Sequence, residues 1–302
     1  MSKAVVSGQA IYQWRAWAIQ FAQSNNVEAF EVDWLLQGVT PLTSTALRLE
    51  TYLSQTDIPI TLSLERLTEK WQQRAAKRVP VQYLVGETPW RDFILTVTPD
   101  VLIPRPETEL IIDIALNLAK QSPSAGELLT GHWADLGTGS GAIALALAKQ
   151  LPTATIHAID ISSKAIKVAR SNVQRNNLTH RITLYQGSWL TPLDSIKGNL
   201  AAIVSNPPYI PSKTVLTLQP EVTHHEPHLA LDGGPEGLDA LNYLVGNSAS
   251  YLRPGGLFLC ELMDGQAQTV AALIADQSDY AQITIHEDLS GIQRFVSACK
   301  AL

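Results

Sequence analysis

The stretch Asp135-Leu136-Gly137-Thr138-Gly139-Ser140-Gly141 follows a short apolar run and precedes a helix-forming segment. Glycines in such a strand-to-helix turn let the backbone approach a ligand closely at the N-terminus of the helix. The glycine spacing here is G-x-G-x-G. Dinucleotide-binding loops have G-x-G-x-x-G, and a P-loop would continue with Gly-Lys-Ser/Thr. The stretch therefore predicts a ligand-binding βα turn that binds neither a dinucleotide nor a nucleoside triphosphate.

An acidic residue, Asp160, ends the next apolar run. In open α/β sheets, an acidic side chain about twenty residues beyond the glycine loop accepts hydrogen bonds from ribose hydroxyls. The two features together suit a nucleoside that has a ribose but no pyrophosphate. We therefore expect S-adenosylmethionine as the cofactor, with its amino-acid end along the loop formed by Gly137, Thr138, Gly139, Ser140 and Gly141.

Strand and helix patterns alternate from about residue 107 onward. We expect strands at 132–136, 155–159, 182–185, 201–205, 256–262, 281–286 and 295–298. We expect helices at 107–120, 142–150, 163–176, 238–251 and 266–276. Runs such as 201–204 are apolar on both faces, as the strands of a buried parallel sheet are. This pattern predicts an α/β fold with an open, mostly parallel, Rossmann-like sheet and helices on both of its sides.

The chain before this region has a different character. Apolar residues recur at helical spacing through residues 1–85, and alternation within 86–106 suggests a β-hairpin. We therefore expect a helical partner-binding domain at 1–85, a hairpin linker at 86–106 and the α/β domain at 107–302. One helix also carries a basic stripe that is either a solvated face or a docking face for an acidic or phosphate-bearing partner: Arg66, Lys70, Arg74 and Lys77.

Composition narrows the class of protein. The 302 residues carry 22 basic and 28 acidic side chains, for a net charge of −6. General nucleic-acid binders are usually basic, so we expect no stable nucleic-acid binding. A membrane span needs about 18 or more consecutive apolar residues, and a signal peptide needs an apolar core. Neither pattern occurs, so we expect a cytoplasmic protein that does not bind membranes.

Cysteines and histidines suggest neither a disulfide scaffold nor a metal site. Cys260 and Cys299 are far apart in the sequence, which fits a reducing compartment. His224, His225 and His228 are clustered, but adjacent histidines point in different directions and the proline between them interrupts any helical face. We expect no metal.

A second chemical motif, Asn206-Pro207-Pro208-Tyr209, follows the fourth expected strand of the sheet. It lies at the carboxyl edge, where open α/β sheets bind ligands. The prolines remove two backbone donors and hold the loop extended. The Asn206 side-chain oxygen and the Pro207 carbonyl can then accept both hydrogens of a planar –NH2 group, while Tyr209 forms an aromatic wall beside it.

This arrangement answers a chemical problem. A primary amide or an exocyclic base amine is a poor nucleophile, because its lone pair is delocalised. Holding both N–H groups aims the nitrogen at an electrophile and stabilises the positive charge that develops there. A sulfonium methyl group is such an electrophile, and the proton can leave after the methyl transfer. The motif fits both a protein glutamine methyltransferase and a nucleic-acid adenine methyltransferase, although adenine would require base extrusion and a positively charged cleft.

Several motifs together resemble one family, the HemK/PrmC proteins, which are release factor glutamine N5-methyltransferases. They are the glycine loop, the Asn206–Tyr209 motif, Gln82–Gly86, Val101–Glu109, Glu226–Leu238 and Asp288–Arg294. The resemblance covers about 80–298. It implies a class I methyltransferase sheet and, as substrate, the Gly-Gly-Gln tip of class 1 peptide-chain release factors.

The resemblance also implies roles for residues. The cofactor would contact the glycine loop, Asp160, Trp189 and Asn206, and the substrate glutamine would lie against Asn206, Pro207, Pro208 and Tyr209. Three positions depart from the family pattern: Ser188, Met263 and Thr223. Arg105 and Glu107 form a linker salt bridge or line the pocket, and we expect Glu226 to order the loop beside the active site. A related family that modifies a ribosomal-protein glutamine remains an alternative.

Overall fold

The computed structural model describes residues 4–302, so the first three residues of the expected N-terminal domain lie outside the described residues. The chain divides into two compact units. The first unit holds the residues up to Glu87 together with Gln219–His225, and the second holds Thr88–Leu218 and Glu226–Leu302. The short segment 219–225, which we expected within the α/β domain, thus belongs to the helical unit.

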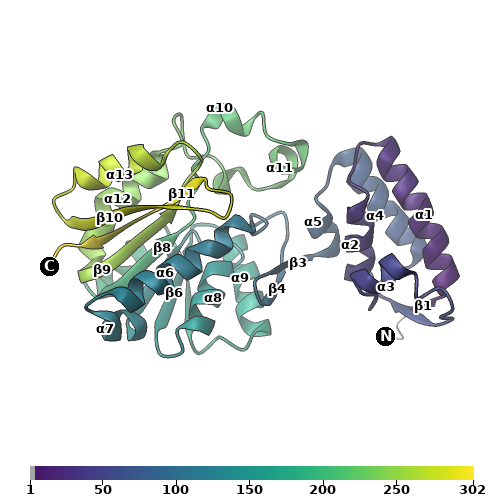
Figure 1. Ribbon diagram of the computed structural model, residues 1–302, viewed down its shortest axis with the longest axis horizontal. Coiled ribbons are helices and arrows are strands. Elements are labelled where there is room, and N and C mark those ends of the chain that lie inside the picture. Colours follow the sequence, from purple (N-terminus) through teal and green to yellow (C-terminus); the bar gives the residue numbers. More distant parts are fainter. Residues whose placement is uncertain (1–3) are drawn as a thin grey trace. The chain divides into compact units, whose positions relative to one another are not determined.

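The first unit is mainly helical, as expected (Figure 1). Its helices are α1 (Gly8–Ser24), α2 (Phe30–Val39), α3 (Ser44–Leu49), α4 (Leu64–Lys77), α5 (Val81–Val85) and α11 (Pro220–His225). A two-stranded antiparallel sheet, β1 (Ala4–Val6) with β2 (Ile58–Ile60), was not predicted, because strands of three residues leave almost no alternation to detect.

Tryptophans hold the core of this unit together. The indole of Trp71 on α4 donates to the Ala18 carbonyl on α1 at 2.9 Å, and the indole of Trp14 donates to the Thr68 hydroxyl at 2.9 Å. Buried indole N–H groups need such partners, so these two bonds fix how α1 lies against α4.

The basic stripe on α4 is neither a uniformly solvated face nor a free docking face. Arg74 is only 5% exposed and binds both carboxylate oxygens of Glu31 at 2.5 and 2.8 Å. The remaining guanidinium nitrogen of Arg74 binds the carboxylate of Glu221, on α11, at 2.8 Å. Lys70 donates to the Leu84 carbonyl at 2.8 Å. The sequence pattern could not show that Arg74 is buried, because the carboxylates that pair with it come from distant segments of the chain.

The second unit is built on a seven-stranded sheet with the order β10-β11-β9-β8-β5-β6-β7. The strands are β5 (His132–Leu136), β6 (Thr155–Asp160), β7 (Ile182–Gln186), β8 (Leu200–Ser205), β9 (Leu252–Glu261), β10 (Tyr280–Glu287) and β11 (Gln293–Lys300). The first five are parallel, and β11 is antiparallel to both of its neighbours. The sheet is therefore open and mostly parallel, as expected.

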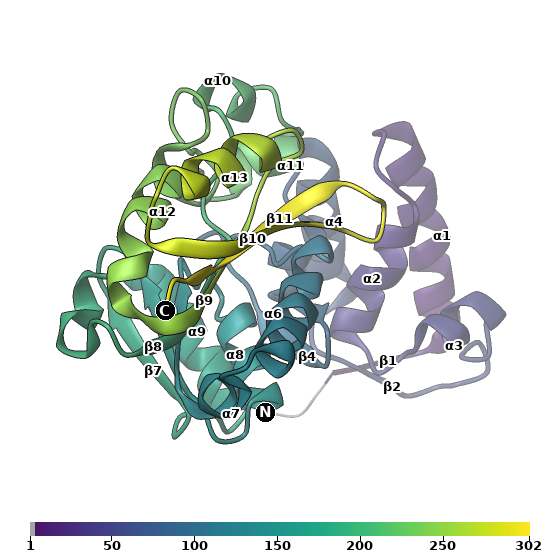
Figure 2. The same ribbon diagram turned by 60° about the vertical axis from the view of Figure 1, so that its left-hand side comes forward.

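Helices cover both faces of this sheet (Figures 1 and 2). The helices of this unit are α6 (Leu110–Gln121), α7 (Ala125–Thr130), α8 (Ala142–Gln150), α9 (Ser163–Arg175), α10 (Ser212–Val215), α12 (Asp239–Tyr251) and α13 (Ala267–Ala275), with short 3-10 turns at Glu107–Glu109, Thr191–Ile196 and His228–Ala230. Adjacent residues of β5 face opposite cores, with Trp133 against α6 and α8 and Ala134 against α12 and α13. Two-sided burial explains the continuous apolar runs.

The expected hairpin exists as β3 (Glu87–Trp90) paired with β4 (Phe93–Thr96). Three of its side chains, Trp90, Phe93 and Leu95, belong to the same hydrophobic core as α6 and α8. From Thr88 onward the hairpin is therefore part of the second unit, where it buries its apolar face against the hydrophobic core beside the sheet.

A chain of polar side chains crosses the buried parallel strands. His132 Nδ1 lies 2.9 Å from His157 Nε2, and His157 Nδ1 lies 3.1 Å from the Tyr185 hydroxyl. Burial, with a smaller contribution from His132, lowers the pKa of His157 to about 4 from its usual 6.5. The folded state therefore takes up a proton at His157 less readily than the unfolded chain.

At neutral pH this histidine is uncharged in both states, and as pH falls from 6.5 toward 4 the unfolded chain takes up the proton first, which lowers the free energy of unfolding. Between pH 7.5 and pH 5, we expect wild type to lose about 1 kcal/mol more unfolding free energy than His157→Gln, allowing for solvent screening. Urea unfolding at the two pH values measures this difference. His180→Gln, at an exposed site, is the control, and equal losses in wild type and His157→Gln would refute the assignment.

Candidate active site

The glycine loop is fixed to the end of the neighbouring strand. The backbone N–H groups of Gly137 and Thr138 both donate to the Ile159 carbonyl at 2.9 Å. Gly137 and Gly139 have φ values of 76° and 54°, in the left-handed region that glycine adopts without strain. A Cβ at Gly139 would have no described atom within 4 Å and would project into open space. The loop thus leaves the space above it free.

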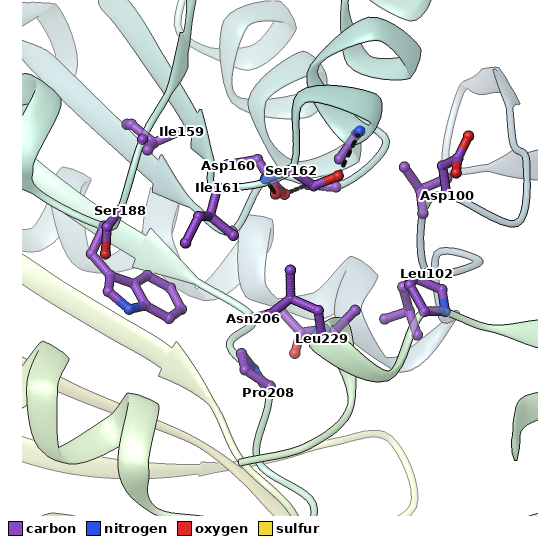
Figure 3. Close-up of a pocket in the computed structure, with 18 residues that line it drawn as sticks. Asp100, Leu102, Ile159, Asp160, Ile161, Ser162, Ser188, Asn206, Pro208 and Leu229 are labelled. Carbon is purple, nitrogen blue, oxygen red and sulfur yellow. Dashed lines mark hydrogen bonds between the residues drawn. The ribbon is translucent and has the colours of Figure 1, made fainter. Parts of the chain in front are cut away.

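Asp160 faces this loop with both oxygens oriented (Figure 3). One carboxylate oxygen accepts the Gly139 N–H at 2.9 Å, and the other accepts the Ser162 N–H at 2.8 Å. Burial raises the pKa of the Asp160 carboxyl, and the two backbone hydrogen bonds oppose that effect. Each oxygen retains acceptor capacity for a further donor, such as a ribose hydroxyl.

The rest of the glycine loop has supporting contacts. The Thr138 hydroxyl donates to Asp135 at 2.6 Å, and the Ser140 carbonyl accepts from the Asn172 amide at 2.9 Å. Gly141 lies against α9, where a Cβ would come within 3.3 Å of the Ala169 Cβ. Complete burial raises the pKa of Asp135 to about 7, against the opposing effect of the Thr138 hydroxyl.

Trp189 has a φ of 47°, which is unusual for a bulky residue and is often found at functional positions. Its ring lies 3.6 Å from the position that a Cβ on Gly137 would occupy, and it stacks on Tyr243 with ring centroids 6.3 Å apart. The glycine loop and this indole therefore approach each other closely.

Asn206 extends from the end of β8, next to the glycine loop that follows β5. Its side-chain amide nitrogen donates to the Thr108 hydroxyl at 3.0 Å. The amide oxygen of Asn206 is then available to accept. The preceding residue, Ser205, donates its hydroxyl to the Leu136 carbonyl at 2.7 Å and ties the two strand ends together.

Tyr209 is anchored at two points. Its hydroxyl donates to Glu261 at 3.1 Å, and its carbonyl accepts from the Gln266 amide at 2.9 Å. Burial raises the pKa of the Tyr209 phenol, and the Glu261 carboxylate raises it further. The phenol therefore stays protonated and acts as a donor.

These loops surround one pocket, shown in Figure 3. Of the expected site residues, six line it: Gly137, Gly139, Asp160, Trp189, Asn206 and Pro208. Five others from the same two loops do not: Thr138, Ser140, Gly141, Pro207 and Tyr209. The pocket lies at the carboxyl ends of β5 and β8, which are neighbours in the sheet. The chain continues from β5 to β6 on one side and from β8 to β9 on the other, and such a switch point is the usual place for a ligand in an open α/β sheet.

Sequence reasoning missed two walls of this pocket. Asp100, Val101 and Leu102, which follow the hairpin, form one wall, and Pro227, Leu229 and Ala230 contribute to another. No local pattern marks these residues as ligand-facing, although all of them except Asp100 lie in motifs that carry the family resemblance. Ser188, one of the three departures from the family pattern, also lines the pocket.

Arg105 does form a salt bridge, but its partner is Glu226 rather than a neighbour in the linker. Arg105 donates to the Glu226 carboxylate at 2.6 Å, and this carboxylate is almost fully buried. Burial raises the pKa of Glu226 and the Arg105 guanidinium opposes the shift. The bond connects the segment after the hairpin with the residue just before Pro227 of the pocket wall.

The clustered histidines are divided between the two units. His225 contacts the Lys77 carbonyl at 2.6 Å in the first unit, and His228 belongs to the second. Across residues 4–302 no group of three or more potential ligands is placed to hold a metal ion. Over the same residues, every helix is too short or too polar to cross a membrane.

Comparison with known proteins identifies the family to which this chain belongs. Residues 112–234 match the methyltransferase small domain, and residues 13–86 match the PrmC N-terminal domain. A release factor glutamine methyltransferase of Synechocystis is 49% identical over 298 residues, which cover 99% of each chain. One of Thermosynechococcus vestitus is 44% identical and covers 97% of this chain and 99% of its own. The chain belongs to the release factor glutamine methyltransferase family.

Membership of this family confirms the predicted enzyme class, a methyltransferase that uses S-adenosylmethionine. Among solved structures, the hMettl16 catalytic domain in complex with an MAT2A 3′UTR hairpin matches with a TM-score of 0.54 and 14% identity, over 88% of each chain. At that identity the match concerns the fold alone, and it confirms the class I methyltransferase architecture.

The pocket residues fit this cofactor. The glycine loop offers an open, side-chain-free surface at Gly139, and Asp160 presents two oriented oxygens beside it. The flat indole of Trp189 and the apolar Ile161 line the same space. An amino-acid group, a ribose and an adenine ring therefore each have a chemically matched surface.

Proposed function

We propose that this protein methylates the side-chain amide nitrogen of the glutamine in the Gly-Gly-Gln motif of class 1 peptide-chain release factors. One observation supports the amide specificity above others: the Asn206 nitrogen is committed to Thr108 at 3.0 Å, so the Asn206 oxygen is the atom offered to a ligand in the cofactor pocket. An acceptor at this position suits the N–H of a carboxamide.

In the proposed roles, Asn206 and the Pro207 carbonyl hold the two amide hydrogens of the glutamine. Pro208 and Tyr209 shape the surrounding loop, and Gly137–Gly141, Asp160 and Trp189 hold the cofactor. Bound there, S-adenosylmethionine would supply the methyl group, and the electron pair of the broken carbon–sulfur bond would stay on sulfur while the amide nitrogen bonds the carbon. The two acceptors stabilise the charge that develops on the amide, and the extra proton then leaves to water.

The helical unit is proposed to bind the release factor, and the protein is proposed to act in the cytoplasm, where its substrate works. The buried ion pairs of Arg74 argue that this unit recognises its partner through other residues than the centre of the α4 basic stripe. Nucleic acid is not the proposed partner, since the chain carries a net charge of −6.

The test is transfer of a radiolabelled methyl group to purified class 1 release factors. Three comparison substrates are needed: a release factor with the motif glutamine changed to alanine, the large-subunit ribosomal proteins, and duplex DNA. We expect label only on the intact release factor, with the methyl group located on the glutamine by mass spectrometry. Label that persists after the glutamine is removed, or that appears on DNA, would contradict the proposal.

A further inference from the structure

One fully buried side-chain amide connects two of the segments that surround the cofactor pocket. It belongs to Asn172, on α9, which is 0% exposed. Its nitrogen donates to the Thr96 carbonyl at 3.0 Å and to the Ser140 carbonyl at 2.9 Å. Its oxygen accepts the Thr96 N–H at 2.7 Å. Both amide hydrogens and the amide oxygen are thus engaged, all by backbone groups of other segments.

The three bonds fix the orientation of this amide. Two carbonyl groups face its nitrogen and one N–H faces its oxygen, so a turned-over amide would oppose like groups at all three positions. Aspartate at residue 172 would keep the acceptor and lose the two donors, while alanine would leave all three backbone groups without this partner. Buried backbone groups without partners are costly, so the segments would shift to regain them.

Both bonded segments contribute to the pocket. Ser140 belongs to the glycine loop, and Thr96 is the last residue of β4. The chain beyond Thr96 soon reaches Asp100 and Leu102, which line one side of the pocket (Figure 3). The helix that carries the amide, α9, itself begins three residues after Asp160. One side chain therefore joins the glycine loop, the wall that follows the hairpin and the helix that follows the acidic strand end.

We propose that Asn172 is a positioning residue for S-adenosylmethionine: its amide holds the glycine loop and the wall after the hairpin at the separation that the cofactor requires. Asn172 is not among the residues that line the pocket, so it acts through the backbone of its partners. Ala169 lies on the same face of α9, where its small side chain lets Gly141 approach the helix. This role goes beyond the proposed function and is independent of the methyl acceptor.

Two other residues of α9 provide matched comparisons. Lys164 also links α9 to the wall, with its ammonium group 3.0 Å from the Asp100 carboxylate, but its side chain is 71% exposed. Such exposed ion pairs contribute little. Val173 is 2% exposed and packs in the core beside the sheet. Val173→Ala should therefore destabilise the same helix while keeping all three bonds of the Asn172 amide.

The first experiment measures calorimetric Kd values of Asn172→Asp, Asn172→Ala, Lys164→Ala and Val173→Ala, together with their melting temperatures. The ligands are S-adenosylhomocysteine and 5′-methylthioadenosine, which lacks the amino-acid end. Both Asn172 variants should raise the Kd of S-adenosylhomocysteine roughly ten- to a hundredfold. Their preference for S-adenosylhomocysteine over 5′-methylthioadenosine should fall at least about fivefold, because the glycine loop is expected to hold the amino-acid end.

The two control variants should keep both Kd values within about threefold of wild type. A residue that only stabilises the fold would lower the melting temperature and leave the preference between the two ligands unchanged. The positioning role is refuted if Asn172→Asp keeps the wild-type Kd and preference, or if Val173→Ala loses as much affinity at a similar loss of melting temperature.

The second experiment uses wild type alone, because cofactor binding and the protection of a group that organises the pocket are linked. Hydrogen exchange of the Asn172 side-chain amide is followed by NMR with and without S-adenosylhomocysteine, the resonance being assigned from its proximity to the Thr96 N–H. The ligand should slow this exchange at least about tenfold. The Asn176 side-chain amide, which donates to the Asn172 backbone carbonyl at 2.8 Å, should change less than about twofold. Equal slowing of both amides, or of neither, would overturn the proposal.

Neither experiment includes a methyl acceptor, so this proposal and the proposed function fail separately. If wild type methylated no release factor while the Asn172 variants lost cofactor affinity as expected, the proposed substrate would be wrong and the role of Asn172 would stand. Normal methylation of release factors, combined with unchanged cofactor affinity in Asn172→Asp, would refute only the role of Asn172.

Discussion

Asn206→Ala should reduce the rate of methyl transfer by roughly a hundred- to a thousandfold, which is the usual cost of losing one preorganised polar contact to a developing charge. Alanine removes the oxygen that the Thr108 contact leaves facing the pocket. It leaves the glycine loop and both Asp160 hydrogen bonds in place. The loss should therefore appear in kcat, with S-adenosylhomocysteine affinity changed by no more than about tenfold.

Single-turnover methyl transfer at saturating cofactor measures this effect, and calorimetry with S-adenosylhomocysteine measures the affinity. Asn199→Ala is the matched control, because Asn199 is an exposed residue in a turn before β8 whose side chain bonds only weakly to the Lys197 carbonyl at 3.5 Å. That control should keep wild-type activity. A purified Asn206→Ala protein that turned over near the wild-type rate would show that this side chain does not hold the amide.

Elements whose residues fix their own local geometry could be predicted from the sequence. The strand 132–136 and the helix 142–150 were predicted with the bounds that the structure has, because a buried parallel strand and an alanine-rich helix both carry strong patterns. The glycine loop between them was recognised for a related reason: its φ values of 76° and 54° at Gly137 and Gly139 demand glycine.

Contacts between distant segments could not be predicted. Arg74 looked like one charge in a solvated stripe, and its burial depends on Glu31 and Glu221, which lie 43 and 147 residues away. Arg105 similarly finds Glu226, 121 residues along the chain. A local pattern shows the charge but not the partner that makes burial possible.

The candidate site likewise contains some residues that a local pattern marks and others that only contacts between distant segments bring into place. Gly137, Gly139, Asp160 and Asn206, which line the pocket, were recognisable as candidates because each lies where a strand ends at the carboxyl edge of the sheet. Thr108 accepts a hydrogen bond from the Asn206 amide and Glu261 accepts one from the Tyr209 hydroxyl, but neither residue carries a spacing signal, since the 3-10 turn and the end of β9 reach this loop only in the folded chain.

Asp160→Ala should weaken cofactor binding by about 1.5–3 kcal/mol, which corresponds to roughly a 10- to 150-fold rise in Kd. The carboxylate has two tasks in the structure. It orients the glycine loop through the Gly139 N–H at 2.9 Å and the next helix through the Ser162 N–H at 2.8 Å, and it offers its remaining lone pairs to the pocket. Calorimetry with S-adenosylhomocysteine measures the change, and Asp276→Ala, at an exposed helix end, should leave Kd unaltered.

A cofactor analogue separates these two tasks. S-adenosylhomocysteine without its ribose 2′ and 3′ hydroxyls should bind wild type more weakly than the intact compound, whereas Asp160→Ala should bind both with nearly equal affinity, since the acceptor for those hydroxyls is gone. If Asp160 acted only by holding Gly139 and Ser162, the variant would still prefer the intact ribose to the same degree as wild type. Unchanged preference would therefore remove Asp160 from the ribose site, even if the overall affinity fell as expected.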